Sequence, residues 1–246
     1  MADESVRTAL VTGAGGPGGI AAAICRALLR DGWAVVATGH GPGGDALVAE
    51  LGETGRFHWR DADLADTAQI PALFDTAEQL AGSHVDALVA AHARSLRGGL
   101  LEVTPAEFDA HMAVNARGTL LLMQEFARRW RGAHGSGRIV SFVSGPPLPG
   151  EIAYAASKGA IDWLTLTAAA ELAPRGISVN AIDPGPTDTG WMTADVAADI
   201  ARRSPLGRTG QPQDAAELVA FLCSGRGGWI TGQTLRSDGG WSRLRR

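Results

Sequence analysis

Lysine and tyrosine are almost missing from this sequence of 246 residues. Of the 22 basic residues, 21 are arginine, and the one lysine, Lys158, follows the one tyrosine, Tyr154, by four positions. Residues four apart lie on the same face of a helix, so we expect the Lys158 ammonium near the Tyr154 phenol. A compact charge there would stabilise the phenolate and lower its pKa from about 10. The pair therefore predicts a phenol that exchanges protons with an alcohol or carbonyl oxygen, with a chance pair on an amphipathic helix as the alternative.

Cysteine is also scarce, and long apolar runs are absent from the sequence. Cys25 and Cys223 are far apart and lie in apolar helical patterns, which predicts buried thiols of a cytosolic protein and neither a disulfide nor a metal site. The net charge is −4 and the arginines are scattered, so no basic stripe predicts a nucleic-acid partner. No apolar run approaches the length that crosses a bilayer, and residues 1–7 do not resemble a signal peptide. We expect a soluble cytoplasmic protein without a membrane partner.

Short apolar or β-branched runs alternate with longer helical patterns along the chain. Nearly continuous apolar runs are typical of parallel strands that are buried on both faces, and right-handed crossovers between them give a doubly wound sheet. The sequence predicts an α/β fold, a single Rossmann-type domain over residues 1–246 with about seven parallel strands and helices on both faces. The expected strands are 7–12, 33–38, 56–61, 86–91, 137–143, 177–182 and 233–237, and the expected helices are 19–30, 43–52, 67–81, 105–131, 152–173, 192–203 and 212–224.

A glycine-rich segment over residues 12–21 follows the first expected strand. Glycines permit a tight turn and let the backbone approach a pyrophosphate, whose charge suits the N-terminus of the following helix. The segment predicts a dinucleotide site, with a plain strand-to-helix turn as the alternative.

The order and spacing of several motifs resemble the classical short-chain dehydrogenase/reductase family over essentially the whole chain. The matching residues are the glycine turn, Asp63-Leu64, Asn115, Ser144, Tyr154, Lys158, Asp183-Pro184-Gly185-Pro186-Thr187, Trp229-Ile230-Thr231-Gly232-Gln233 and Asp238-Gly239-Gly240. The resemblance implies a nicotinamide cofactor and a proton relay through Asn115, Ser144, Tyr154 and Lys158.

Each catalytic residue has an implied role. Ser144 would hydrogen-bond the substrate oxygen, and Tyr154 would give or take the proton. Lys158 would lower the pKa of the phenol and also bind the nicotinamide ribose. Asn115 would support a water that connects Lys158 to solvent, or would make a hydrogen bond at a helix kink.

The resemblance also implies a set of cofactor contacts. Asp63 would bond near the adenine and Thr187 would bond the nicotinamide carboxamide, and for each residue a helix N-cap is the alternative. The expected contacts are Gly13, Gly15, Gly19, Ile20, Thr38, Asp63, Leu64, Ala91, Tyr154, Lys158, Pro184, Gly185 and Thr187.

Two segments depart from the family pattern. The glycine turn is longer than usual and ends in Ala21 where a third glycine is common, a form that looks more like the turn of enoyl reductases. Those enzymes space tyrosine and lysine further apart, and position 161 here is isoleucine. The family's Asn-Asn-Ala-Gly reads Ala-Ala-His-Ala over residues 90–93, which removes side-chain bonds that brace the sheet. We expect a structural role for His92.

The catalytic serine stands closer to Tyr154 than is usual in the family. We assign Ser144 because Gly-Pro-Pro follows it, which places it at the carboxyl end of a strand where ligands bind. Ser141, further upstream, is expected to be structural.

The predicted function is that of an NAD(P)-dependent oxidoreductase of the ketoreductase or alcohol dehydrogenase type, which transfers hydride between the cofactor and a carbonyl or secondary alcohol. The alternatives are a non-redox enzyme of the same fold, similar to dehalogenating lyases, and a nucleotide-binding sensor or scaffold. The dehalogenating relatives carry arginine at the position of Lys158, which argues against that reading.

The second expected strand ends at Thr38 and is followed by Gly39 and His40, without the carboxylate that repels NADP in this family. Thr38 can bond either ribose form and His40 can approach a 2′-phosphate, so NADP(H) is preferred over NAD(H) by a small margin. Asp45, folded back as the missing carboxylate, is the alternative.

The remaining expectations concern partners. Segments 92–97, 146–152 and 189–196 are mostly apolar, which favours a hydrophobic or aromatic substrate, and Arg94 and Arg97 are expected to face solvent. The resemblance implies a homotetramer in which helices 105–131 and 152–173 pair between subunits.

Overall fold

The computed structural model describes residues 6–40 and 43–243. Residues 1–5, which bear on the expectation about a signal peptide, and residues 41–42 and 244–246 lie outside the described residues. Seven parallel strands form one sheet in the order β3-β2-β1-β4-β5-β6-β7. They are β1 (Thr8–Thr12), β2 (Ala34–Gly39), β3 (Phe57–Asp61), β4 (Ala87–Ala90), β5 (Gly137–Phe142), β6 (Ile177–Asp183) and β7 (Thr234–Arg236). The predicted fold class is confirmed.

The strands are apolar throughout because both faces of the sheet are covered. In β1, Ala9 and Val11 pack into one hydrophobic core, whereas Leu10 between them packs into a second core on the opposite face. Successive side chains of a strand point to opposite faces, so a strand buried on both sides carries no polar alternation. This explains why the strand ends lie within one residue of those expected from the sequence.

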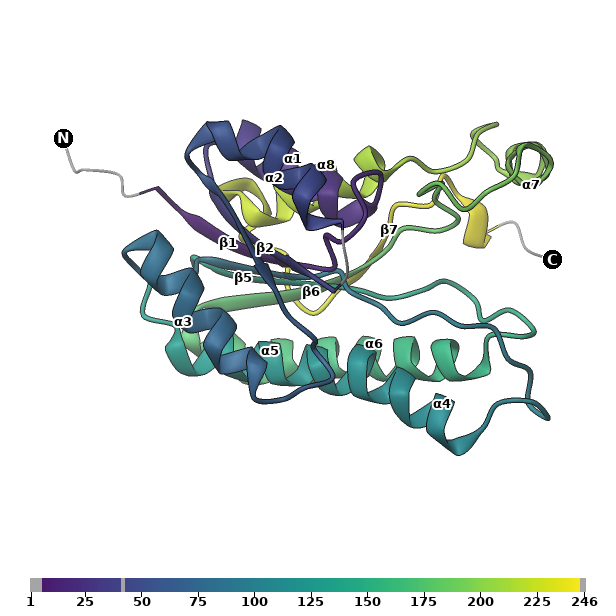
Figure 1. Ribbon diagram of the computed structural model, residues 1–246, viewed down its shortest axis with the longest axis horizontal. Helices are drawn as coiled ribbons and strands as arrows, with labels where there is room; N and C mark the ends of the chain where they lie inside the picture. Colours follow the sequence, from purple (N-terminus) through teal and green to yellow (C-terminus); the bar gives the residue numbers. More distant parts are fainter. Residues whose placement is uncertain (1–5, 41–42, 244–246) are drawn as a thin grey trace.

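Helices cover both faces of the sheet (Figure 1). One layer holds α1 (Ile20–Arg30), α2 (Gly44–Leu51) and α8 (Pro212–Cys223), and the other holds α3 (Gln69–Ala81), α5 (Gly118–Arg129) and α6 (Ile152–Leu172). Figure 1 shows α4 (Pro105–His111) and α7 (Ala194–Arg203) beyond the carboxyl ends of the strands. The loops on that edge therefore carry the residues that could meet a ligand.

The prediction of one long helix over residues 105–131 is wrong in one respect. A π-helical segment, Met112–Arg117, separates α4 from α5. Such segments occur mostly as single wide turns, frequently at functional sites. Here the carbonyl of Val114 lies 3.0 Å from Nε2 of His92, and Asn115 within the segment is fully buried. The tertiary bonds of this segment account for the interruption.

Candidate active site

The glycine turn is held against the loops that follow β2 and β4. Gly13 has φ +85°, and a Cβ built there would lie 2.6 Å from the backbone of His92. A Cβ at Gly43 would overlap the carbonyl of Gly15. Only glycine permits these conformations and approaches, so the sequence keeps glycine at both contacts. The turn is thereby fixed beside the carboxyl ends of β1, β2 and β4.

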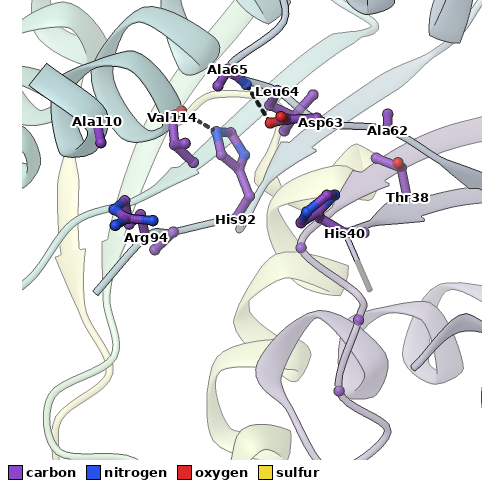
Figure 2. Close-up of a pocket in the computed structure, with 15 residues that line it drawn as sticks. Thr38, His40, Ala62, Asp63, Leu64, Ala65, His92, Arg94, Ala110 and Val114 are labelled. Atoms are coloured by element: carbon purple, nitrogen blue, oxygen red, sulfur yellow. Dashed lines mark hydrogen bonds between the residues drawn. The ribbon is translucent and has the colours of Figure 1, made fainter. Parts of the chain in front are cut away.

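A cavity of roughly 480 Å³ lies at this edge (Figure 2). It is lined by Gly13, Gly15, Gly16, Thr38, Gly39, His40, Ala62, Asp63, Leu64, Ala65, His92, Ala93, Arg94, Ala110 and Val114. Because the strand order reverses between β1 and β4, the cavity lies at the switch point of the sheet, where α/β proteins of this kind bind ligands. Five of the predicted cofactor contacts line it, and they are Gly13, Gly15, Thr38, Asp63 and Leu64. The predicted contacts that do not line it are Gly19, Ile20, Ala91, Tyr154, Lys158, Pro184, Gly185 and Thr187.

Two features of the cavity region fit a dinucleotide. The Oγ1 atom of Thr38 is buried in the cavity wall and has no hydrogen-bond partner among the described residues. A buried hydroxyl without a partner is costly, and a ribose hydroxyl would supply one. Helix α1 starts after Gly19 without a side-chain cap among the described residues, so its first N–H groups are available to an anion. Thr38 would hold the ribose, and the turn over 13–20 would hold the pyrophosphate.

Asp63 makes local bonds in the cavity wall. Its Oδ1 accepts a hydrogen bond from the N–H of Ala65 at 2.9 Å, which Figure 2 shows, and its own N–H donates to Gln69 Oε1 at 2.9 Å. Helix α3 begins at Gln69 with Ala68 as its N-cap, so the N-cap alternative for Asp63 is wrong.

Thr187 follows β6 and is buried. Its hydroxyl donates to the carbonyl of Pro184 at 3.1 Å. The N-cap of α7 is Thr193, whose Oγ1 accepts from the N–H of Val196, so the N-cap alternative for Thr187 is also wrong. The role of Thr187 toward the nicotinamide stays a prediction.

Ser144, Tyr154 and Lys158 come together past the end of β5. The hydroxyl of Ser144 hydrogen-bonds the phenolic oxygen of Tyr154. Tyr154 and Lys158 lie one turn apart on α6, with Lys158 Nζ 5.7 Å from the centroid of the Tyr154 ring. Lys158 is only 4% exposed, and its ammonium donates to the carbonyl of Phe142 at 2.8 Å. The predicted serine, tyrosine and lysine are thus adjacent, with Lys158 held by the end of the neighbouring strand.

The direction predicted for the Tyr154 pKa is wrong in this structure. Burial raises the pKa of Tyr154, the hydrogen bond from Ser144 lowers it, and the carboxylates of Glu151 and Asp183 raise it further. The net shift is upward because burial, the largest effect, disfavours the charged phenolate. Burial also lowers the pKa of Lys158 to about 8.

Asn115 connects the loop after β4 to α6. Its Oδ1 accepts from the N–H of Arg94 at 2.7 Å, and its Nδ2 donates to the Arg94 carbonyl at 3.0 Å and to Ser157 Oγ at 2.8 Å. Ser157 Oγ in turn donates to the carbonyl of Tyr154 at 2.7 Å. These bonds join the π-helical segment to the loop after β4 and to α6, and the role of Asn115 toward a water that serves Lys158 stays a prediction. Ser157 was not predicted from the sequence to be a site residue, although it directly precedes Lys158 in the chain.

His92 braces the region from which the family asparagines are missing. Its Nδ1 lies 2.7 Å from Thr12 Oγ1. Its Nε2 lies 3.0 Å from the carbonyl of Val114, a contact that Figure 2 shows. A carbonyl can only accept, so Nε2 carries the proton and Nδ1 accepts from the threonine hydroxyl. Burial, with a smaller effect of Lys158, lowers the pKa of His92 to about 3, so the ring is neutral. Both nitrogens are occupied, which gives His92 the structural role expected for it.

Two further side chains refine the site. Ser141 is fully buried and its hydroxyl is paired with Thr165 at 2.8 Å, which leaves Ser144 as the serine beside the phenol. Arg94 was expected to face solvent; its side chain is 34% exposed, but the residue also lines the cavity and its guanidinium pairs with Glu107 at 3.0 Å. Asn115 holds the Arg94 backbone against the π-helical segment, which brings the residue to the cavity wall.

Other kinds of site find little support in the described part of the chain. Within residues 6–40 and 43–243, no three His, Cys, Asp or Glu side chains gather as metal ligands would. Over the same ranges no helix is long and apolar enough to traverse a bilayer. Cys25 and Cys223 are free and buried, which confirms the prediction of buried thiols.

Comparisons with known proteins agree with this geometry. A family model described as enoyl-(acyl carrier protein) reductase matches residues 13–242. The chain is 40% identical to the uncharacterized oxidoreductase YjdA of Bacillus subtilis, over 99% of this chain and 100% of that protein. It is 36% identical to the cis-4-hydroxycyclohexanecarboxylate dehydrogenase of Sinomonas cyclohexanicum, over 97% of each chain. A blue fluorescent protein from a metagenomic library, solved in complex with NADPH, matches with a TM-score of 0.86 at 34% identity, over 96% of this chain and 98% of that one.

Proposed function

The chain belongs to the short-chain dehydrogenase/reductase family of NAD(P)-dependent oxidoreductases, and from that premise we propose that it interconverts a ketone or aldehyde and the corresponding alcohol. The observation that carries the proposal is the Tyr154 phenol, which hydrogen-bonds Ser144 and lies one helical turn from the buried Lys158. A phenol and a hydroxyl that share one hydrogen bond can both reach the same substrate oxygen.

The residues have separate tasks in this mechanism. The bound nicotinamide supplies the hydride in reduction and accepts it in oxidation. Tyr154 donates its phenolic proton to the carbonyl oxygen as negative charge develops there, and takes a proton from the alcohol in the reverse direction. Ser144 holds the same oxygen with its hydroxyl. The Lys158 ammonium adds positive charge one turn away, which favours the phenolate that remains after proton donation.

Three competing functions fit less well. Enoyl reduction is named in the description of the matching family model, but Tyr154 and Lys158 are four residues apart here and Ile161 is buried in the subunit core. A dehalogenating lyase or a nucleotide sensor would leave unexplained why a buried lysine, with its desolvated charge, is kept beside the phenol.

NADP(H) is the proposed cofactor, in preference to NAD(H). Thr38 and His40 line the cavity at the end of β2, and Asp63, the one carboxylate among the described lining residues, accepts a hydrogen bond from the N–H of Ala65. Asp45, the alternative carboxylate, lies in the first turn of α2 and is exposed. The structural neighbour solved with NADPH is in keeping with this choice.

The proposed substrate is an apolar, ring-bearing ketone or alcohol. The loops after β4 and β5 are joined by a bridge between Gly98 and Glu151, which places their exposed apolar residues Leu96 and Ile152 near the reacting edge. Trp191, on the segment before α7, is also exposed, and its indole N–H donates to the carbonyl of Thr187. The relative that acts on a hydroxycyclohexane ring supports this class.

A homotetramer is proposed as the assembly, with α5 and α6 at a subunit interface. On α6, Trp163 is 73% exposed and Leu166 is 37% exposed, which leaves an apolar stripe on the outer face of the helix. Ile161 and Ala169, on the same helix, are buried within the subunit and take no part in this stripe.

Turnover with cyclic and aromatic ketones, measured with NADPH and with NADH, tests the proposed function. We expect reduction of at least one cyclic ketone and faster turnover with NADPH. Tight cofactor binding without turnover across the panel would favour a nucleotide sensor over an enzyme.

A further inference from the structure

Asp183 is a buried carboxylate at the carboxyl end of β6 whose contacts reach both loops of the reacting centre. It is 2% exposed. Its Oδ1 accepts from the N–H of Gly185 at 3.1 Å, and the carboxylate also accepts a backbone hydrogen bond from Gly145. Gly145 follows Ser144 directly, and Gly185 opens the turn that leads to Thr187. One side chain therefore fastens the serine loop to the loop after β6.

The fit around this carboxylate is close. A Cβ built on Gly145 would lie 2.9 Å from Asp183 Oδ2, so a side chain at the position after Ser144 would have to displace this carboxylate. Arg236 Nε lies 3.6 Å from the same oxygen. A carboxylate with two N–H donors and a nearby guanidinium has a defined orientation, so the loops that it joins are held in one relative position.

Several charged groups face the phenol and the carboxylate. Tyr154 is faced by the Ser144 hydroxyl, by the carboxylates of Glu151 and Asp183, and by the Lys158 ammonium above its ring. Asp183 is faced by Asp238 and Arg236. Glu151 and Asp183 act in the same direction on the phenol, since both raise the pKa of Tyr154. Only Asp183 also bonds the two loops.

We propose that Asp183 is a positioning residue for carbonyl reduction, which holds Ser144 and the Gly185 turn in register on either side of the reacting oxygen. The proposal rests on the proposed function. The negative charge of Asp183 has a second effect, because it adds to burial of the phenol in favouring the protonated form that donates to a carbonyl.

Asp183→Asn and Glu151→Gln separate positioning from charge. Both remove one negative charge near Tyr154, but only the first disturbs the bonds to Gly145 and Gly185. We expect Asp183→Asn to lower kcat at its own optimal pH by about 10- to 100-fold, because small misplacements of catalytic groups have effects of this size. Glu151→Gln removes a charge without touching either loop bond, so its kcat at its own optimum should fall clearly less than that of Asp183→Asn. Equal kcat optima for Asp183→Asn and wild type would overturn the positioning role.

The phenol itself supplies a readout that needs no substrate. Tyr154 is the one tyrosine of the chain, so the ultraviolet absorption of tyrosinate during an alkaline titration reports its pKa alone. Both variants should titrate at lower pH than wild type. An unchanged midpoint in Asp183→Asn would overturn the charge effect even if no substrate were turned over, which keeps this result apart from failure of the proposed function.

A rescue experiment tests the contact with the serine loop independently of activity. Gly145→Ala should destabilise the wild type, because its methyl group would press on the Asp183 carboxylate. In an Asp183→Ala background the same change should have a clearly smaller effect on the unfolding midpoint. If Asp183→Ala does not fold, Asp183→Ser replaces it as the background, because its side chain is also shorter than that of aspartate. Equal destabilisation in both backgrounds would overturn the contact and with it the positioning role.

Discussion

The ammonium of Lys158 lies 5.7 Å from the centroid of the Tyr154 ring and is bonded to the carbonyl of Phe142. It is buried between α6 and the end of β5, and burial lowers its pKa to about 8. A guanidinium is a broad planar fork, whereas an ammonium is compact enough for such a position. This explains how a chain that otherwise uses only arginine has kept one lysine.

Replacing Lys158 by Met is expected to stabilise the protein at neutral pH while abolishing turnover. The folded-state pKa of about 8 lies below the ordinary 10.5, so the unfolded chain binds more protons between these values. The contribution of Lys158 to the free energy of unfolding is therefore most unfavourable below pH 8 and is relieved as the pH rises to 10.5. We expect a gain of roughly 1–3 kcal/mol at pH 7, after loss of the bond to Phe142.

Denaturant unfolding of wild type and Lys158→Met at pH 7 and at pH 10.5 measures this difference. The gain should shrink toward the higher pH. Lys158→Arg serves as the control that retains charge, and it should be less stable than wild type at both values. If Lys158→Met were less stable than wild type at pH 7, burial of the Lys158 charge would not be what destabilises the fold.

His92 is expected to control the stability of the protein at acid pH. Its folded-state pKa of about 3 lies below the ordinary 6.5, so the stability that neutral His92 provides is complete above pH 6.5 and is lost as the pH falls toward 3. His92→Ala leaves Thr12 and the Val114 carbonyl without this partner, and we expect a loss of about 2–4 kcal/mol at pH 7. His92→Asn, which keeps a donor and an acceptor, should lose less.

Thermal unfolding of the three proteins from pH 7 to pH 4 tests this account. The wild type should lose more stability on acidification than either variant, since only the wild type carries the buried His92 imidazole. If the stability of all three proteins fell in parallel with pH, the role assigned to the His92 ring would be contradicted.

His40 is expected to contribute to cofactor choice. If NADPH gives the higher kcat/KM, His40→Ala should reduce the ratio of NADPH to NADH by several-fold, because a contact to the 2′-phosphate is removed. Thr38→Val is the matched control: Thr38 Oγ1 has no partner among the described residues, so the fold should tolerate the change while both cofactors bind less tightly. An unchanged ratio in His40→Ala would remove His40 from the account, and a higher kcat/KM with NADH would reverse the choice of cofactor.

Trp163 is expected to lie in a subunit interface. Trp163→Arg should lower the oligomeric state in sedimentation experiments at micromolar concentration, because it adds charge to the apolar face of α6. Leu101→Arg alters a side chain that is at least as exposed but lies on the loop before α4, and it should leave the assembly intact. A monomeric wild type, or dissociation by Leu101→Arg alone, would argue against the proposed interface.

The fold could be predicted from sequence because its strands are buried on both faces. Residues such as Leu10 and Val11 pack into different cores, so the strands appear as uninterrupted apolar runs between helical patterns. The grouping of Ser144, Tyr154 and Lys158 was equally accessible, since it follows from one helix and the strand end before it.

Features that depend on contacts between distant segments were not accessible. The π-helical segment around Asn115 is held by His92 and the Arg94 backbone, about twenty residues earlier in the chain. The direction of the Tyr154 pKa depends on how deeply folding buries the phenol. Asp183 looked like one residue of a loop motif, and only the packing of β5 beside β6 brings it to Gly145.

The central claim is that the single tyrosine of this chain is the general acid and base of a nicotinamide-dependent reaction. Steady-state reduction of a responsive cyclic ketone by wild type and Tyr154→Phe, at saturating NADPH, tests it most directly, with melting temperature and NADPH affinity as controls. We expect both controls to be nearly unchanged and kcat to fall by at least about two orders of magnitude, as loss of a general acid commonly causes. A Tyr154→Phe protein that turns over at the wild-type rate would contradict the claim.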